Sequence, residues 1–123
     1  MENEYSVEFF EKSNGTCPAE EYIESLDTKL AAKVYRTLGI LEENGPDLRE
    51  PYSKHLDDGI FEVRAKVSTN ISRVLYFFYI GMRIILTHGF TKKVQKTPPL
   101  EIERAKSYRK EFLESEAKKN ENS

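Results

Sequence analysis

Arg64 and Arg73 are the two residues of this 123-residue sequence whose type and spacing best suit phosphate chemistry. They lie in two strand-like segments, "GIFEVRAKV" and "ISRVLYFFYI", separated by the short turn sequence "STN". A hairpin would bring both guanidinium groups to one end of a sheet, where their N–H donors match phosphate oxygens. The alternative is that both are solvated charges on the sheet surface.

A second cationic cluster lies in "TKKVQKTPP", where Lys92, Lys93 and Lys96 separate an apolar strand-like segment from a helix. Thr97 is the expected N-cap of that helix and Pro98 its first residue. Lysine ammonium groups attract phosphate, and a helix N-terminus adds backbone N–H donors and a favourable dipole. The segment therefore predicts an anion site, with a solubilising loop as the alternative.

The net charge of −2 conceals how the charges are distributed along the chain. Residues 63–99 contain no Asp or Glu, although the whole chain has 21 carboxylates. The cationic residues of that window include Lys66 as well as the clusters above. This separation predicts a basic face, which would raise the local concentration of a polyanion.

The two histidines and one aromatic residue could complete such a site. His55 precedes the strand-like segments and His88 lies near the end of the last of them, and either could transfer protons near neutral pH. A buried or edge position is the alternative for His88. Phe90, beside the lysines, could stack a nucleobase, whereas the aromatic residues at positions 76–79 are expected in the core.

Metal and thiol chemistry have little support in the sequence. The histidines are far apart, and no compact His/Cys/Asp/Glu spacing or glycine-rich phosphate loop occurs, so no metal or other cofactor is expected. The single cysteine, Cys17, allows no internal disulfide and fits a reducing compartment. It is expected to cap the helix that Pro18 opens, rather than to act as a nucleophile.

These residues require an α+β scaffold. The pattern predicts a strand at 5–13, one bent or two separate helices up to Gly45, a polar loop at 47–59, strands at 59–67, 71–80 and 83–90, and a last helix. The order is β-α-α-β-β-β-α, an antiparallel meander with the helices packed on one side. Residues 1–115 form one domain, and the polar tail 116–123 is expected to fray. No membrane span or secretory signal is visible.

A set of short motifs, taken together, resembles the RelE/ParE toxin superfamily, and specifically its phage-derived HigB-like branch. The matching residues, in chain order, are Leu56, Asp58 to Arg64, Arg73 to Tyr76, His88 to Phe90, Lys92, Lys93, Thr97, Pro98, Glu101, Ile102 and Ala105. The earlier strand and helices fit the same layout, so the resemblance covers roughly residues 5–113. It implies the compact RelE-like fold.

The resemblance also implies a function. Such proteins are cytoplasmic toxins of type II toxin–antitoxin systems: metal-independent endoribonucleases that cleave mRNA, usually on the ribosome, and so inhibit translation. The partner of HigB-like toxins is a helix-turn-helix antitoxin, and DNA is bound only through the complex.

The resemblance assigns roles to particular positions. Arg64 and Arg73 would act on the scissile phosphate, and Lys93 would assist proton transfer beside Lys92. Lys54 and His55 match RNA-binding positions of some relatives. With them, the residues expected to bind RNA are Lys66, His88, Phe90, Lys92 and Lys96.

Two alternatives remain open at this stage. One is a non-catalytic inhibitor of a protein target such as DNA gyrase, because one branch of the superfamily acts that way. The other is a non-toxic nucleic-acid-binding accessory domain. A basic face would serve all three functions.

Overall fold

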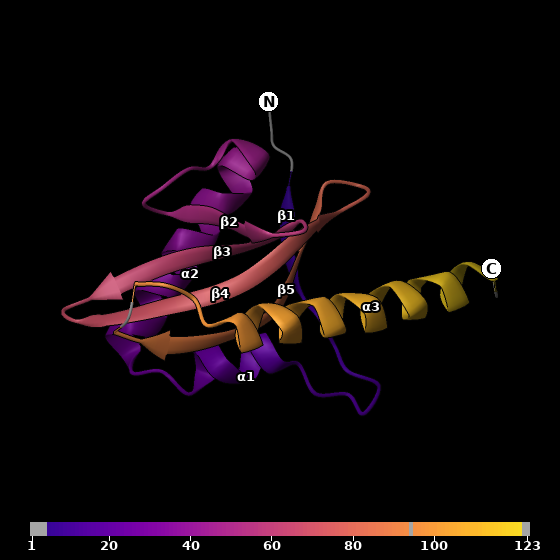
Figure 1. Cartoon of the computed structure of the whole chain (residues 1–123), viewed down its shortest axis with the longest axis horizontal. Coiled ribbons are helices and arrows are strands. Elements are labelled where there is room, and N and C mark those ends of the chain that lie inside the picture. The colour runs from indigo at the N-terminus through magenta and orange to yellow at the C-terminus, as the bar shows by residue number, and fades with distance from the viewer. Residues whose placement is uncertain (1–4, 94, 122–123) are drawn as a thin grey trace.

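The computed structural model describes residues 5–93 and 95–121, and it confirms the α+β class. The chain forms three helices and five strands, and the five strands make one mixed sheet (Figure 1). In chain order these are β1 (Ser6–Phe9), α1 (Pro18–Glu24), α2 (Thr28–Asn44), a 3₁₀ turn (Gly45–Asp47), β2 (Ser53–Asp57), β3 (Ile60–Val67), β4 (Asn70–Tyr79), β5 (Arg83–Lys92) and α3 (Pro99–Glu121).

The sheet has the strand order β1-β5-β4-β3-β2. Strands β2 to β5 form an antiparallel meander, which confirms the predicted hairpins, and β1 pairs in parallel with β5. Strand β2 corrects the expected polar loop at 47–59. Its sequence "SKHLD" reads as a loop because three of its five side chains are exposed at the sheet edge, where alternation with the core is weak.

The helix boundaries follow the predicted signals. Cys17 occupies the N-cap position before Pro18, as expected, but its side chain makes no capping hydrogen bond. Helix α2 starts where the Asp27 side chain accepts a hydrogen bond of 2.9 Å from the backbone N–H of Leu30. Gly45 ends α2 with φ of +53°, a conformation that glycine adopts readily. The last helix starts at Pro99, one residue later than predicted.

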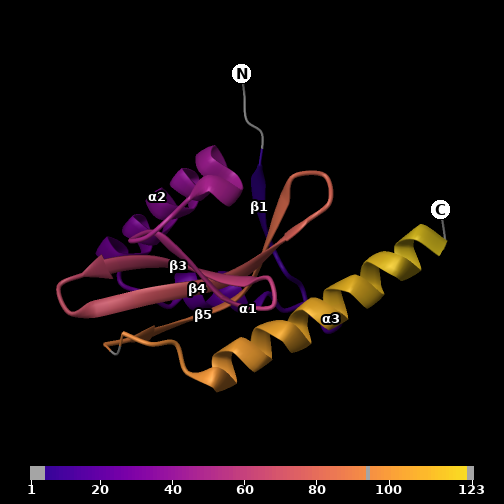
Figure 2. The same ribbon diagram turned by 45° about the horizontal axis from the view of Figure 1, so that its top comes forward.

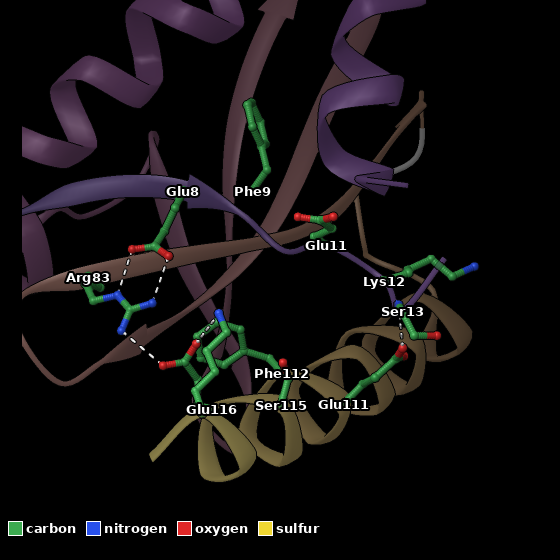
Figure 3. A pocket seen from close by; sticks show the side chains of 11 residues that line it. Glu8, Phe9, Glu11, Lys12, Ser13, Arg83, Glu111, Phe112, Ser115 and Glu116 are labelled. Atoms are coloured by element: carbon green, nitrogen blue, oxygen red, sulfur yellow. Dashed lines mark hydrogen bonds and ion pairs between the residues drawn. The ribbon is translucent and has the colours of Figure 1, made fainter. Parts of the chain in front are cut away.

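Helices α1 and α2 pack together on one side of the sheet, as expected, whereas α3 crosses its other face (Figure 2). Ala105 and Phe112 of α3 belong to a second apolar cluster that includes Leu75 and Phe77 of β4. These two strand residues point away from the face that α1 and α2 cover, because successive side chains of a strand alternate between faces. The end of α3 is also tied to the sheet by Arg83, which lies between Glu8 of β1 and Glu116 of α3 (Figure 3).

Helix α3 extends past the predicted domain boundary at residue 115 and continues to Glu121. Part of the predicted tail is therefore helical. Residues 122–123 of that tail, and residues 1–4 of the predicted domain, lie outside the described residues.

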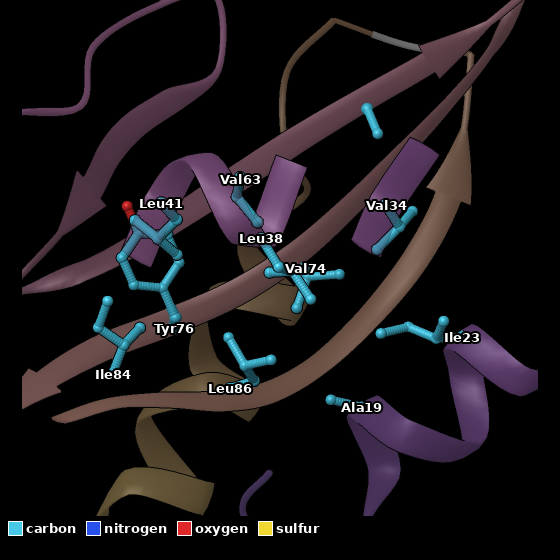
Figure 4. Close-up of a cluster of buried hydrophobic side chains, with 11 residues drawn as sticks. Ala19, Ile23, Val34, Leu38, Leu41, Val63, Val74, Tyr76, Ile84 and Leu86 are labelled. Carbon is cyan, nitrogen blue, oxygen red and sulfur yellow. The ribbon is translucent and has the colours of Figure 1, made fainter. Parts of the chain in front are cut away.

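The main apolar core lies between the sheet and the helices α1 and α2 (Figure 4). The stripe predicted from spacing in α2 is buried and faces the inward side chains of β3, β4 and β5. It consists of Leu30, Val34, Leu38 and Leu41. This layer fixes the central strands, and the opposite face of the same strands carries the residues expected to bind phosphate.

Candidate functional site

The strand register brings most of the predicted site residues to one face of the sheet. Arg64 of β3 lies directly opposite Arg73 of β4, which lies opposite Phe90 of β5. Residues paired across strands point to the same face, so these three form a row. The neighbouring rows on this face contain Lys66 with Ile71 and Lys92, and Lys54 with Glu62, Leu75 and His88.

A buried carboxylate organises the two arginines. Glu62 is fully buried, and its Oε2 accepts a hydrogen bond of 2.7 Å from Arg64 Nε. Its Oε1 lies 3.4 Å from Arg73 Nε and accepts a hydrogen bond from the Thr97 hydroxyl. A carboxylate shared in this way lets two guanidinium groups lie side by side despite their mutual repulsion.

Both arginines also point at one oxygen atom. The Gln95 carbonyl accepts a hydrogen bond of 2.6 Å from Arg64 Nη2 and one of 2.8 Å from Arg73 Nη2. Two guanidinium groups that converge on a single acceptor could also both donate to an anionic phosphate oxygen. Here the segment that precedes α3 supplies that oxygen itself.

The two arginines differ in exposure. The Arg73 side chain is 0% exposed, whereas that of Arg64 is 22% exposed. Burial lowers the pKa of the Arg73 guanidinium, Glu62 opposes this effect, and Arg64 adds to it. The Arg73 guanidinium carbon also lies 5.9 Å from the centre of the Phe90 ring. A ligand at the surface would therefore meet Arg64 first and the charge of Arg73 behind it.

The predicted lysines surround this pair without being buried. Lys92 is exposed at the end of β5, and Lys93 and Lys96 are exposed in the segment before α3. Lys54 at the sheet edge and Lys66 near the end of β3 are exposed as well. Their positions are those of groups that attract an anion rather than fix its geometry.

The structure places the two histidines on opposite faces of the sheet. His88 is buried beneath α3, where its Nε2 lies 2.9 Å from Glu101 Oε1 and its Nδ1 lies 3.1 Å from Thr87 Oγ1. Burial lowers the pKa of His88, and Glu101 opposes this shift. His55 is exposed on the opposite face of β2, where its Nε2 accepts a hydrogen bond of 3.1 Å from the Gly59 N–H.

Helix α1 supports the site from the other face of the sheet. The Tyr22 hydroxyl lies 2.7 Å from Ser72 Oγ, in the residue before Arg73, and it also contacts Thr91. The Tyr22 ring fits because residue 89 is glycine: a Cβ there would lie 2.4 Å from the ring and 2.9 Å from the Arg73 carbonyl oxygen. The glycine of the motif "HGF" is thus needed for close packing of α1 on the sheet.

Sequence reasoning missed three parts of the site: Glu62, the Gln95 carbonyl and Thr97 as a buried hydrogen-bond donor. Glu62 stands two residues before Arg64, so strand alternation alone places it on the same face. Thr97 was expected only as a helix cap, and its buried bond to Glu62 depends on the path of the chain into α3.

The described part of the chain offers little support for metal or thiol chemistry. Among those residues, no group of three or more His, Cys, Asp or Glu side chains could hold a metal ion. Cys17 is a free thiol whose pKa is raised by partial burial and by nearby carboxylates. None of the described helices is both long enough and apolar enough to cross a membrane.

The sequence of this chain matches one known protein family over most of its length. The chain matches the family "Phage derived protein Gp49-like" over residues 21–110, and it belongs to that family. This family is part of the RelE/HigB-type toxin group. No curated protein matches the chain.

Proposed function

We propose that this protein is the toxin of a type II toxin–antitoxin system, of the HigB-like branch, and that it cleaves mRNA on the ribosome without a metal ion. Family membership supports the toxin class. The observation that carries the nuclease proposal is the convergence of Arg64 and Arg73 on one oxygen atom, at 2.6 and 2.8 Å. In the proposed complex, a phosphate oxygen of the message takes the place of the Gln95 carbonyl.

The reaction needs no group beyond the RNA and the protein. The 2′-OH attacks the adjacent phosphorus, the bond from phosphorus to O5′ breaks, and a 2′,3′-cyclic phosphate and a 5′-OH result. The 2′-OH loses its proton and the leaving O5′ gains one. Negative charge rises on the phosphoryl oxygens in the transition state, and fixed cations on a rigid sheet stabilise it.

The residues divide this work according to their exposure. Arg64 would contact the phosphate, and the buried Arg73 would add its charge and hold Glu62 and Arg64 in place. Lys93 would assist one of the proton transfers, with Lys92 and Lys96 along the RNA backbone. Lys54, Lys66 and Phe90 share the same sheet face and extend the RNA-binding surface.

The two histidines take different parts in this proposal. His55 is exposed and would hold RNA at the sheet edge. His88 is buried, so its contribution to RNA binding would be indirect, through its bond to Glu101 near the start of α3.

The proposed partners follow from the toxin class. A helix-turn-helix antitoxin would neutralise the protein in the cytoplasm, and DNA would be bound only through that complex. The net charge of −2 weakens binding of free RNA and favours a message presented by the ribosome.

The complete burial of Arg73 also favours a second candidate, in which both arginines stabilise the fold and the protein inhibits a target such as DNA gyrase without cleaving RNA. The two candidates differ in whether a message is cut.

The test is primer extension on a reporter mRNA after induction of the wild type, of Arg64→Gln and of Lys110→Gln. Arg64 is partly exposed and Glu62 keeps its pairing with Arg73, so the variant should still fold, and cleavage should fall about 10²- to 10³-fold. Lys110 is an exposed lysine of α3 and serves as the matched control for loss of one positive charge. Growth arrest without any cleavage by the wild type would reject the nuclease and support the second candidate.

A further inference from the structure

The last part of the β3 edge, beside α2, is not paired with β2. The pairing of β2 with β3 begins at Ser53, opposite Val63, and the Arg64 N–H then donates to the Tyr52 carbonyl at 2.8 Å. Beyond that point the Lys66 carbonyl accepts a hydrogen bond of 3.1 Å from Lys33 Nζ of α2. A side chain of α2, rather than another strand, thus lies along this part of the edge.

The surface beside that edge is a cationic groove. Lys29, Lys33 and Arg36 recur at spacings of four and three in α2, so they share one side of the helix. With Lys66 they line a groove of about 380 Å³ between α2 and the end of β3. Its remaining lining residues are Ala32, Val67 and Ser68, so no carboxylate faces it.

A smaller pocket connects this groove to the candidate site. The pocket has a volume of about 230 Å³ and shares Lys33 and Lys66 with the groove. It is also lined by Arg64, Gln95 and Tyr52, and Tyr52 has 43% of its surface exposed. The walls include the apolar side chains of Pro51, Ala65 and Ile71. A continuous path therefore runs from the paired arginines, over the edge of β3, to α2.

The cations of this groove differ from those on the α3 side of the molecule. Arg83, Lys106 and Arg109 each lie within 3.0 Å of a carboxylate oxygen. Within the described residues, no ion pair joins Lys29, Lys33, Arg36 or Lys66 to a carboxylate. Four cations lining one groove without counter-charges raise each other's energy, and a polyanion would relieve that repulsion.

We propose that this groove binds the single RNA strand that continues from the phosphate held by Arg64. Lys29, Lys33 and Arg36 bind successive phosphates, and the pocket beside Arg64 receives a base, which stacks on Tyr52. The proposal rests on the RNA substrate of the proposed function, but it assigns a binding surface on α2 that the arginine site does not include.

The alternation of charged and apolar surface favours RNA over an acidic protein segment. Single-stranded nucleic acid is bound by a positive groove that follows the backbone, combined with aromatic side chains on which bases stack. The path has both parts, since Tyr52 and the apolar walls lie between Arg64 and the cations of α2. A run of carboxylates would use the cations and leave the apolar pocket empty.

The experiment measures binding of a fluorescent single-stranded 2′-O-methyl oligoribonucleotide, which lacks the attacking hydroxyl and cannot be cut. The test variant is Lys29→Gln/Lys33→Gln/Arg36→Gln, and the control is Lys110→Gln/Lys118→Gln/Lys119→Gln on the exposed side of α3. We expect the test variant to bind about tenfold or more weakly at low salt. The slope of log affinity against log salt should fall by about 2, because a single strand contributes about 0.7 per phosphate contact. The control should match the wild type in both measurements.

Each other outcome rejects the groove or the nuclease separately. Equal affinity of the test variant and the wild type, or absence of RNA binding by the wild type, would overturn the groove. An oligoglutamate peptide of equal charge that binds the wild type more tightly than the RNA would assign the groove to an acidic protein partner and overturn it too. Reduced binding by the test variant, with no cleavage of unmodified message by the wild type, would reject the nuclease and leave the groove standing.

Discussion

The cleft between β1, β5 and α3 and the groove between α2 and β3 are both lined by charged side chains but use them in opposite ways. In the cleft, which has a volume of about 430 Å³, Arg83 donates to Glu8 at 2.7 and 2.9 Å and lies 3.5 Å from Glu116 (Figure 3). These ion pairs raise the pKa of Arg83. In the groove, which has a volume of about 380 Å³, every charged lining residue is a cation.

This difference teaches that the function of a charged residue depends on its partners more than on its type. A paired charge on the α3 side holds elements together, and an unpaired one on α2 is available to a ligand. The candidate site lies between these extremes, because Glu62 pairs with Arg64 and Arg73 and still leaves Arg64 partly exposed. Substitution of a paired charge should therefore lower stability, and substitution of an unpaired cation should lower RNA affinity.

The largest effect on stability should come from Arg73→Ala. This change leaves Glu62 buried with one cationic partner fewer, and breaking a buried pair costs about 3–5 kcal/mol. Urea denaturation of the variant would measure the loss. Glu62→Gln/Arg73→Ala should recover part of it, because the unpaired charge is then removed. If the double variant lost as much free energy of unfolding as Arg73→Ala and Glu62→Gln lose together, the two residues would not be coupled. The site would then not depend on paired charges.

A smaller loss is expected for Gly89→Ala, which tests how Arg73 is supported from the α1 side. The new Cβ would lie 2.4 Å from the Tyr22 ring, and such overpacking costs about 1–3 kcal/mol. Gly39→Ala in α2 is the matched control, because no atom lies within 4 Å of its added Cβ and alanine favours the helix by about 1 kcal/mol. Thermal unfolding of both variants measures the difference. Equal stability of the two would mean that Tyr22 can move aside without cost.

The smallest effect on stability should come from Arg83→Gln, which compares the cleft beside α3 with the groove beside α2. Its side chain is 30% exposed, so loss of its ion pairs should cost no more than about 1 kcal/mol, and less at high salt. RNA affinity should not change. Lys33→Gln should do the reverse, with weaker RNA binding and nearly unchanged urea stability. An equal loss of RNA affinity in both variants would mean that overall charge, rather than its pairing, controls binding.

The parts of the fold that depend on local patterns were predictable from the sequence. The spacing of Leu30, Val34, Leu38 and Leu41 gave the buried face of α2, and the turn sequences gave the hairpins of β3, β4 and β5. Strand β2 was missed because an edge strand with exposed side chains lacks alternation. The parallel pairing of β1 with β5 was also missed, because it joins distant segments and has no local signal.

For the candidate site, too, the parts set by local patterns were predictable from the sequence and the parts set by tertiary contacts were not. The hairpin predicted that Arg64 and Arg73 would meet, and the register confirms that they are direct neighbours. The number of residues between them could not show that Arg73 is buried, because its burial depends on the segment from Gln95 to Thr97 folding back over it. The cations of α2 were not linked to the site, because helix packing beside a free strand edge is a tertiary property.

The position of β1 has a consequence for synthesis of the protein. Ser6, near the start of the chain, pairs with Arg83, and the site also needs Gln95 and Thr97. Contacts between such distant residues slow folding. Because a chain is made from its N-terminus, β1 must wait unpaired until β5 has left the ribosome. A nascent chain thus cannot assemble the paired arginines until most of it has been translated, so incomplete products should lack activity.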